Sequence, residues 1–126
     1  MWQKLLLLAA AGAIGTIARF LLAEVVNHYA GKTFPWGTLV VNVLGCFLFG
    51  LVASLADERQ LISDQTRLIV LTGFMGAFTT FSTFAFETTQ LARGQHWLLA
   101  GGNLLAENLL GIAGILLGMA VGRMFG

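Results

Sequence analysis

Long apolar stretches alternate with short polar ones along this chain. Four stretches hold about 20 or more mostly apolar residues each, the length a helix needs to cross the hydrocarbon core of a membrane. They cover about residues 2–26, 37–56, 66–91 and 97–121. The polar segments between them carry charged and turn-forming residues. We therefore expect four membrane-spanning helices joined by short loops.

The third apolar stretch contains an unusual polar interruption. Residues 73–80 include two glycines and end on Thr79 and Thr80, and further hydroxyls follow at Ser82 and Thr83. In hydrocarbon every backbone N–H and C=O needs a partner, so such a break is tolerated only where protein or a water-filled cavity covers it. We therefore expect the third helix to be broken near its middle, at a conduction path or a binding site.

Composition supports an all-α integral membrane protein. Of the 126 residues, 57% are hydrophobic and only 10% are charged, whereas about a quarter of a soluble domain is charged. Four spans use the whole chain, so residues 1–126 are expected to form a single transmembrane domain. No cleavage site follows the first apolar run, which is expected to be retained. A net charge of +1 without a basic cluster argues against nucleic acid as a partner.

Polar side chains also interrupt the other spans. Arg19 lies toward the end of the first span and either snorkels to the headgroups or guards an aqueous vestibule. Asn42 lies inside the second span, where its amide either joins helices or lines a pathway. Glu107 is close to the middle of the fourth span, and an ionisable group at that depth is functional by default.

Positive charges are almost balanced across the membrane. Four spans place both termini on one side, and the basic residues divide into Lys4, Arg59, Arg67 and Arg123 on that side against Lys32, Arg93 and Arg19 on the other. The positive-inside rule then gives only a weak preference. This balance is consistent with insertion in both orientations and with an antiparallel homodimer.

The chemistry of the interruption favours transport over catalysis. Residues 73–76 lack the Gly-Lys-Ser/Thr end of a phosphate loop, and no His-Glu-x-x-His motif occurs, so we expect no enzyme. Phe81 and Phe84 share one helix face, and the edges of their rings are electropositive. If they do not simply face lipid or the core, these edges, the hydroxyls and the Asn42 amide favour a narrow polar track for an anion, without naming the ion.

Two segments resemble the paired signature of the Fluc (CrcB) fluoride channels. They are residues 37–42, Gly-Thr-Leu-Val-Val-Asn, and residues 73–84, Gly-Phe-Met-Gly-Ala-Phe-Thr-Thr-Phe-Ser-Thr-Phe. The second motif is long and specific, and the four-span layout agrees over essentially the whole chain. Ala77 replaces a glycine found in many relatives, and a carboxylate at Glu107 is not typical of the family.

This resemblance implies a fold and a function. Family members are antiparallel, dual-topology homodimers in the bacterial plasma (inner) membrane, and their two pores export fluoride passively from the cytoplasm. The implied fluoride pore contains Asn42, Phe81, Ser82, Thr83 and Phe84.

The resemblance also extends to the surroundings of the pore. Arg19 matches an arginine near the vestibule, and Glu87 matches a carboxylate that follows the phenylalanine motif. Glu107 and Asn108 are further candidates for a polar track in the fourth span.

A structural sodium ion is also implied by the resemblance. In the family it lies on the dimer axis, and here the backbone carbonyls of Gly76 and Thr79 from both subunits would hold it. Because an unwound segment frees carbonyl oxygens, such a site suits a hard monovalent cation.

Two alternative functions remain open on sequence alone. The first is a proton-coupled exporter resembling the small multidrug resistance family, another short four-span dual-topology dimer. Its mechanism needs a carboxylate in the first span, which reads Gly-Ala-Ile-Gly-Thr over residues 12–16, so Glu107 would have to replace it. The second is a structural membrane subunit whose polar residues only join helices, and it predicts no flux.

Overall fold

The protein, described here from a computed structural model over residues 1–58 and 60–125, consists of helices and short connections. Four helical segments are long and apolar enough to cross a membrane: α1 (Trp2–Ala30), α2 (Trp36–Asp57), a composite third span (Asp64–Arg93) and α6 (Trp97–Arg123). The expected all-α fold with four spans is therefore confirmed. Arg59, which entered the charge balance above, lies outside the described residues.

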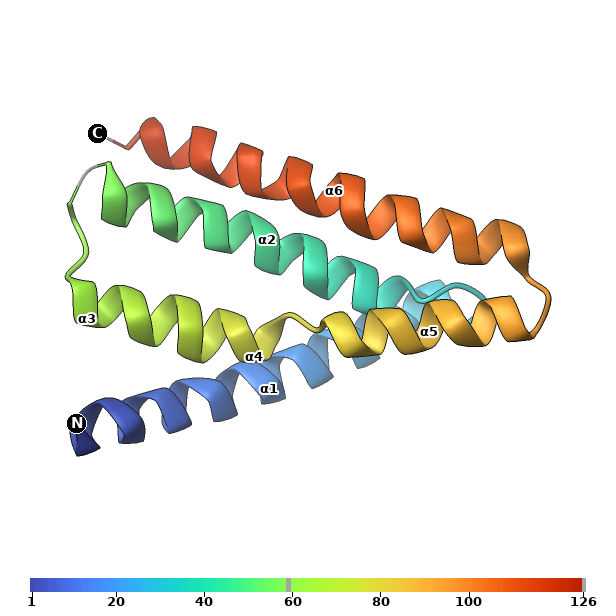
Figure 1. Cartoon of the computed structure of the whole chain (residues 1–126), viewed down its shortest axis with the longest axis horizontal. Coiled ribbons are helices and arrows are strands. Elements are labelled where there is room, and N and C mark those ends of the chain that lie inside the picture. The colour runs from blue at the N-terminus through green and yellow to red at the C-terminus, as the bar shows by residue number, and fades with distance from the viewer. Residues whose placement is uncertain (59, 126) are drawn as a thin grey trace.

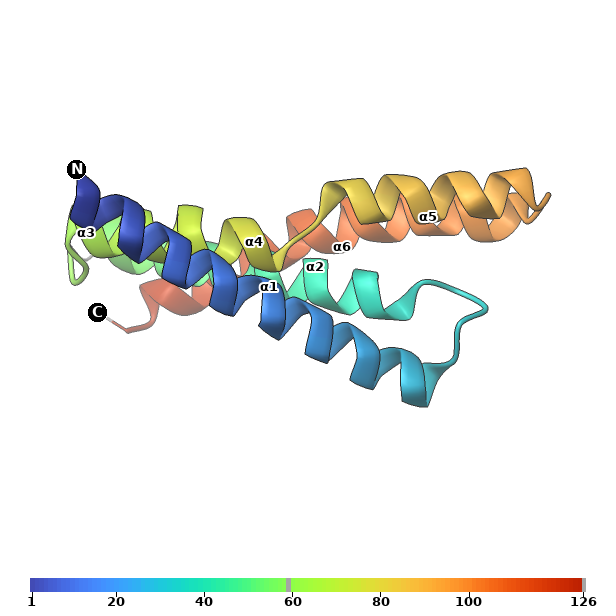
Figure 2. The same ribbon diagram turned by 90° about the horizontal axis from the view of Figure 1, so that it is seen from below.

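Successive spans run in opposite directions, so both termini lie at one end of the molecule (Figure 1). α2 is the central helix, because it packs against α1, α6 and the third span. Seen from below, α5 lies beside α6, whereas α1 diverges from this pair toward the loop that leads into α2 (Figure 2). The middle of the third span thus faces both α1 and α2.

The third span is broken, over a shorter segment than the sequence suggested. It comprises α3 (Asp64–Arg67), the π-helix η1 (Leu68–Met75), α4 (Gly76–Phe78) and α5 (Phe81–Arg93). Only Thr79 and Thr80 leave the helical conformation, with ψ angles of 156° and 111°. The break expected around residues 73–80 is therefore confirmed, but only its last two residues leave the helical conformation. Gly73 is helical and small for a packing reason, since a Cβ there would lie 2.9 Å from the Cβ of Ala11.

The two threonines explain where the helix stops and restarts. The Thr79 hydroxyl donates to the Met75 carbonyl at 3.0 Å, and this carbonyl lies one turn earlier in the helix. The Thr80 hydroxyl accepts from the Thr83 N–H at 3.2 Å, which is the geometry of a helix N-cap. The side chains on the two sides of the break therefore stabilise the ends that it creates.

The first loop is also shorter than expected, because α1 continues to Ala30 rather than ending near residue 26. The chain turns at Gly31, whose φ of 85° suits glycine. Asn27, expected in the loop, instead lies in α1, and its Oδ1 accepts from the Gly37 N–H at 2.9 Å. A side chain of one helix thus satisfies a free N–H at the start of the next.

Glycines bring α2 and α6 into backbone contact. A Cβ built on Gly118 would lie 2.0 Å from the Phe47 carbonyl oxygen, and one built on Gly50 would lie 2.3 Å from that of Ile115. The glycine-rich edge of α6 therefore packs against α2. Membrane helices associate through such close packing, because lipid tails are as apolar as the helix surfaces and provide no hydrophobic driving force.

We predict that Gly118→Ala destabilises the protein by about 1–3 kcal/mol, the usual cost of overpacking. The added methyl has no room beside the Phe47 carbonyl, so α2 and α6 must separate. Thermal unfolding in detergent measures the effect. Ala120→Leu, at an exposed position of the same helix, is the control and should unfold near the wild-type temperature. A wild-type transition for Gly118→Ala would contradict this packing.

Candidate functional site

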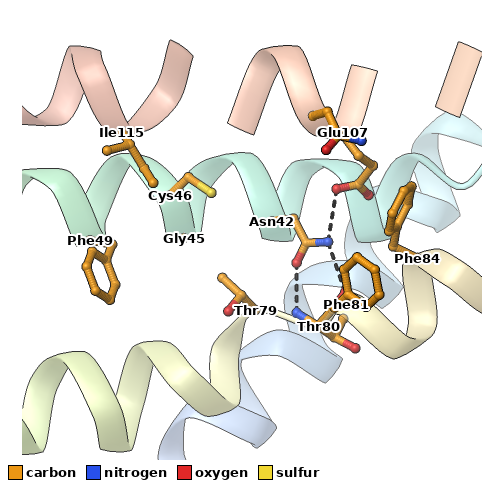
Figure 3. A pocket seen from close by; sticks show the side chains of 11 residues that line it. Asn42, Gly45, Cys46, Phe49, Thr79, Thr80, Phe81, Phe84, Glu107 and Ile115 are labelled. Atoms are coloured by element: carbon orange, nitrogen blue, oxygen red, sulfur yellow. Dashed lines mark hydrogen bonds between the residues drawn. The ribbon is translucent and has the colours of Figure 1, made fainter. Parts of the chain in front are cut away.

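A cavity of about 320 Å³ lies beside the break, between α2, α5 and α6 (Figure 3). Aromatic rings, amides, hydroxyls and one carboxylate line it. The lining residues are Asn42, Gly45, Cys46, Phe49, Thr79, Thr80, Phe81, Phe84, Glu107, Asn108 and Ile115. Asn42, Phe81, Phe84, Glu107 and Asn108, which sequence reasoning singled out from three different spans, thus share one cavity.

Asn42 connects three parts of the chain. Its Oδ1 accepts from the Thr80 N–H at 2.8 Å, and its Nδ2 donates to the Thr80 carbonyl at 3.1 Å. The same Nδ2 donates to Glu107 Oε2 at 3.0 Å. Figure 3 shows the amide between the carboxylate and the break. Asn42 therefore both joins helices and lines the cavity, the two roles that its sequence position left open.

Phe81 and Phe84 lie at the start of α5 with their ring centroids 5.5 Å apart and their planes at 67°. The edge of one ring therefore approaches the other ring, as aromatic pairs prefer. Phe84 is 6% exposed, whereas Phe81 is 77% exposed in the protomer. The pair thus extends from the buried interior to the surface of the protomer.

The hydroxyls next to the two rings have local partners. The Thr80 hydroxyl donates to the Thr83 hydroxyl at 2.9 Å, so both are engaged at the start of α5. Ser82 is exposed. Neither Ser82 nor Thr83 is among the lining residues of the cavity, so the structure places the expected hydroxyl track beside the cavity rather than in its wall.

Arg19 reaches the break from α1, on a different side from Asn42. Its Nε donates to the Ala77 carbonyl at 3.0 Å, and the side chain is half-buried. A guanidinium at the last turn of a helix also interacts favourably with the negative end of the helix dipole. The structure thus gives Arg19 a contact at the end of α4 that sequence reasoning did not anticipate.

Glu87 follows Phe84 by three residues on α5 but lines a different cavity. It lines a second cavity, of about 550 Å³, with Lys32 and His96 near the loops that precede α2 and α6. Its Oε1 is buried and has no hydrogen-bond partner within residues 1–58 and 60–125. Glu87 and Glu107 therefore belong to different cavities, although both were candidates for one polar track.

The break also exposes backbone oxygens suited to a cation. Gly76 is exposed and Thr79 is half-buried. The carbonyl oxygens of both accept none of the hydrogen bonds that bridge the break in the part of the chain described here. A hard cation binds such free carbonyls. Among these same residues, no group of three His, Cys, Asp or Glu side chains could hold a metal ion.

Sequence reasoning missed Thr80 as the backbone partner of Asn42. A local signal was present, because a threonine directly before a helix commonly acts as its N-cap. The Asn42–Glu107 hydrogen bond spans 65 positions of sequence and has no such local signal.

Comparison with known proteins places this geometry in context. Residues 6–119 match the family model described as CrcB-like protein, Camphor Resistance (CrcB). Similar curated proteins include the "Fluoride-specific ion channel FluC" of Nitrosococcus oceani, 55% identical over 98% of this chain and 99% of that protein. The proteins of the same name from Solidesulfovibrio magneticus and Desulforapulum autotrophicum are 50% and 45% identical, each over 98% of this chain and 99% of their own length.

We predict that Asn42→Leu destabilises the protein by about 1–3 kcal/mol, because it leaves the Thr80 N–H without its acceptor. The matched control is Asn108→Leu, which removes an amide that donates to the Leu104 carbonyl of its own helix. Thermal unfolding in detergent and hydrogen exchange at Thr80 measure the two variants. Equal stability of both, with an unchanged exchange rate at Thr80, would contradict the proposed role of Asn42.

Proposed function

The chain belongs to the CrcB family, and on that basis we propose that it is a fluoride-selective ion channel through which fluoride leaves the cytoplasm passively. Family membership makes it a transport protein rather than an enzyme. Its four spans and its bacterial relatives identify a multi-pass protein of the bacterial inner membrane. The exporter alternative has no counterpart among the relatives named above.

The observation that carries the proposal is the convergence of Asn42, Phe81 and Phe84 on one cavity at the break. Fluoride is small and strongly hydrated, so a path must replace its water with other hydrogen-bond donors and partial positive charges. Ring edges supply such charge, and so does the N-terminal end of α5, which begins at Phe81 beside the cavity. Ser82 and Thr83 extend these donors along the first turn of α5.

Easy exit of the anion would follow from the lack of a fixed positive charge at the cavity. No Lys, Arg or His side chain lines this cavity in the part of the chain that the structure describes. An anion that enters is therefore solvated by dipoles and not trapped by a fixed cation, and conduction needs such easy exit. In this proposal Arg19 attracts anions to the vestibule, Asn108 belongs to the polar track at the cavity, and Glu87 continues the track at the second cavity.

The proposed assembly is an antiparallel, dual-topology homodimer with two pores. The near balance of basic residues across the membrane supports insertion in both orientations. The exposure of Phe81 supports a partner that completes the pore, because this ring covers only part of the cavity in one protomer.

Sodium is proposed as a structural cofactor at the break. The carbonyls of Gly76 and Thr79 would hold it together with the same carbonyls of a second copy. Support comes from their lack of hydrogen bonds across the break within the described residues and from the exposure of Gly76. When bound, the cation offsets part of the cost of holding an anion nearby in a low dielectric.

We predict fast fluoride release from potassium fluoride-loaded liposomes on addition of valinomycin, and no release from chloride-loaded ones. Phe81→Ile and Phe84→Ile should each reduce fluoride release to the level of protein-free liposomes, because an aliphatic side chain has no positive edge. A fluoride electrode follows the release.

The matched control for these variants is Phe86→Ile, an exposed phenylalanine of α5 that does not line the cavity. It should release fluoride at the wild-type rate. Size-exclusion chromatography establishes that the variants assemble as the wild type does. Normal fluoride flux through both the Phe81 and Phe84 variants would refute the assignment of the pore.

The sodium proposal predicts a cation-specific gain in stability. Replacing potassium chloride by sodium chloride at equal ionic strength should raise the unfolding temperature, with a gain of about 2.7 kcal/mol when sodium reaches 100 times its dissociation constant. Thermal unfolding in the two salts measures it. Identical unfolding temperatures over a wide range of sodium concentration would rule the site out.

A further inference from the structure

Glu107 occupies an unusual position for a carboxylate in an anion path. It projects from the middle of α6 into the cavity that Phe81 and Phe84 line. Its Oε2 accepts from Asn42, while its Oε1 is buried and has no hydrogen-bond partner in the part of the chain described. The pore amide therefore binds one carboxylate oxygen, while no hydrogen bond within the described residues offsets the burial of the other.

This contact removes the donor that an anion would use. An asparagine amide has two N–H hydrogens. In Asn42 the Nδ2 group donates to both the Thr80 carbonyl and Glu107 Oε2, so no amide hydrogen remains for another acceptor. An ionised Glu107 would also repel an anion that enters the same cavity. The repulsion disappears when the carboxylate takes up a proton, and the neutral acid binds Asn42 more weakly while its O–H can itself donate to the anion.

We propose that Glu107 is a proton-linked determinant of anion access, which excludes fluoride when ionised and admits it when protonated. This inference rests on the proposed fluoride channel and adds its regulation. The step is a simple uptake of one proton from water by the carboxylate. Asn42 then exchanges an intramolecular acceptor for the entering anion, while its contacts with Thr80 hold the break in place.

Within residues 1–58 and 60–125, the surroundings of Glu107 contain no positively charged group that would neutralise it. The helices packed against α6 are α2 and α5. α2 presents the Cys46 thiol to the same cavity, and the carboxylate of Glu87 on α5 interacts electrostatically with Glu107. Asp57 and Arg93 lie at the far ends of these two helices. Within the described residues a proton is thus the simplest counter-charge available to Glu107.

The test is the fluoride current across planar bilayers as a function of pH. Hydrogen fluoride that crosses the lipid is neutral and carries no current, so only ion conduction is recorded. The wild-type current should rise roughly tenfold as the pH is lowered from about 8.5 to about 5, because a lower pH increases the protonated fraction of the carboxylate. Glu107→Gln carries no charge, binds Asn42 only as weakly as a neutral acid does and offers an N–H of its own, so its current should stay at the acidic wild-type level at every pH.

Two further variants complete the design. Glu24→Gln removes an exposed carboxylate of α1 outside both cavities, and it should keep the wild-type pH profile. Glu107→Ser removes the charge with a smaller side chain. It should also conduct independently of pH, which keeps the test decisive if the glutamine variant does not fold.

The outcomes separate this inference from the proposed function. A wild-type fluoride current that does not change with pH overturns the inference and leaves the channel intact. Loss of current in folded Glu107→Gln also overturns it, because the carboxylate would then be required for transport, as in a proton-coupled exporter. Absence of fluoride current from every protein at every pH overturns both proposals.

Discussion

A helix that opens inside an apolar slab leaves N–H and C=O groups that water cannot reach, and each one is costly unless another group binds it. The break at Thr79 and Thr80 creates this problem in the middle of the third span. Asn42 binds the N–H and the carbonyl of Thr80, and Arg19 binds the carbonyl of Ala77. Side chains of α1 and α2 therefore keep the break open in one defined conformation, and the cavity depends on them.

The same requirement explains why structure and function overlap at this site. An amide that satisfies the break must lie inside the membrane, where it can also solvate an ion. Glycines on α2 and α6 make this arrangement compact, since backbone contact at Gly50 and Gly118 brings Glu107 on α6 within hydrogen-bond distance of Asn42 on α2. Close packing of these two helices thus brings the polar side chains of Asn42 and Glu107 into contact inside the membrane.

Much of this could be predicted from the sequence, because length and apolarity decide where a chain can cross a membrane. The four spans and the interruption of the third follow from that pattern, and the motif around Phe81 indicates the family. The extent of the break was predicted poorly, since glycine is used here for close packing at Gly73 and a pair of β-branched residues ends the helix instead. The contacts of Arg19 and Glu107 were missed because long-range partners leave no periodic signal. The homodimer and the sodium ion remain predictions.

The shortness of the break has a geometric consequence for how this site can vary. Only two residues separate the helical turns on either side, and an α-helix advances by about 100° of rotation and 1.5 Å for each residue. Inserting one residue at the start of α5, directly before Phe81, would therefore turn both rings by more than a quarter of a revolution relative to the break and to α2. The two rings would point elsewhere while the composition stayed almost unchanged. The direction in which the rings of α5 point thus depends on the number of residues between them and the break. This number therefore cannot change without moving the rings.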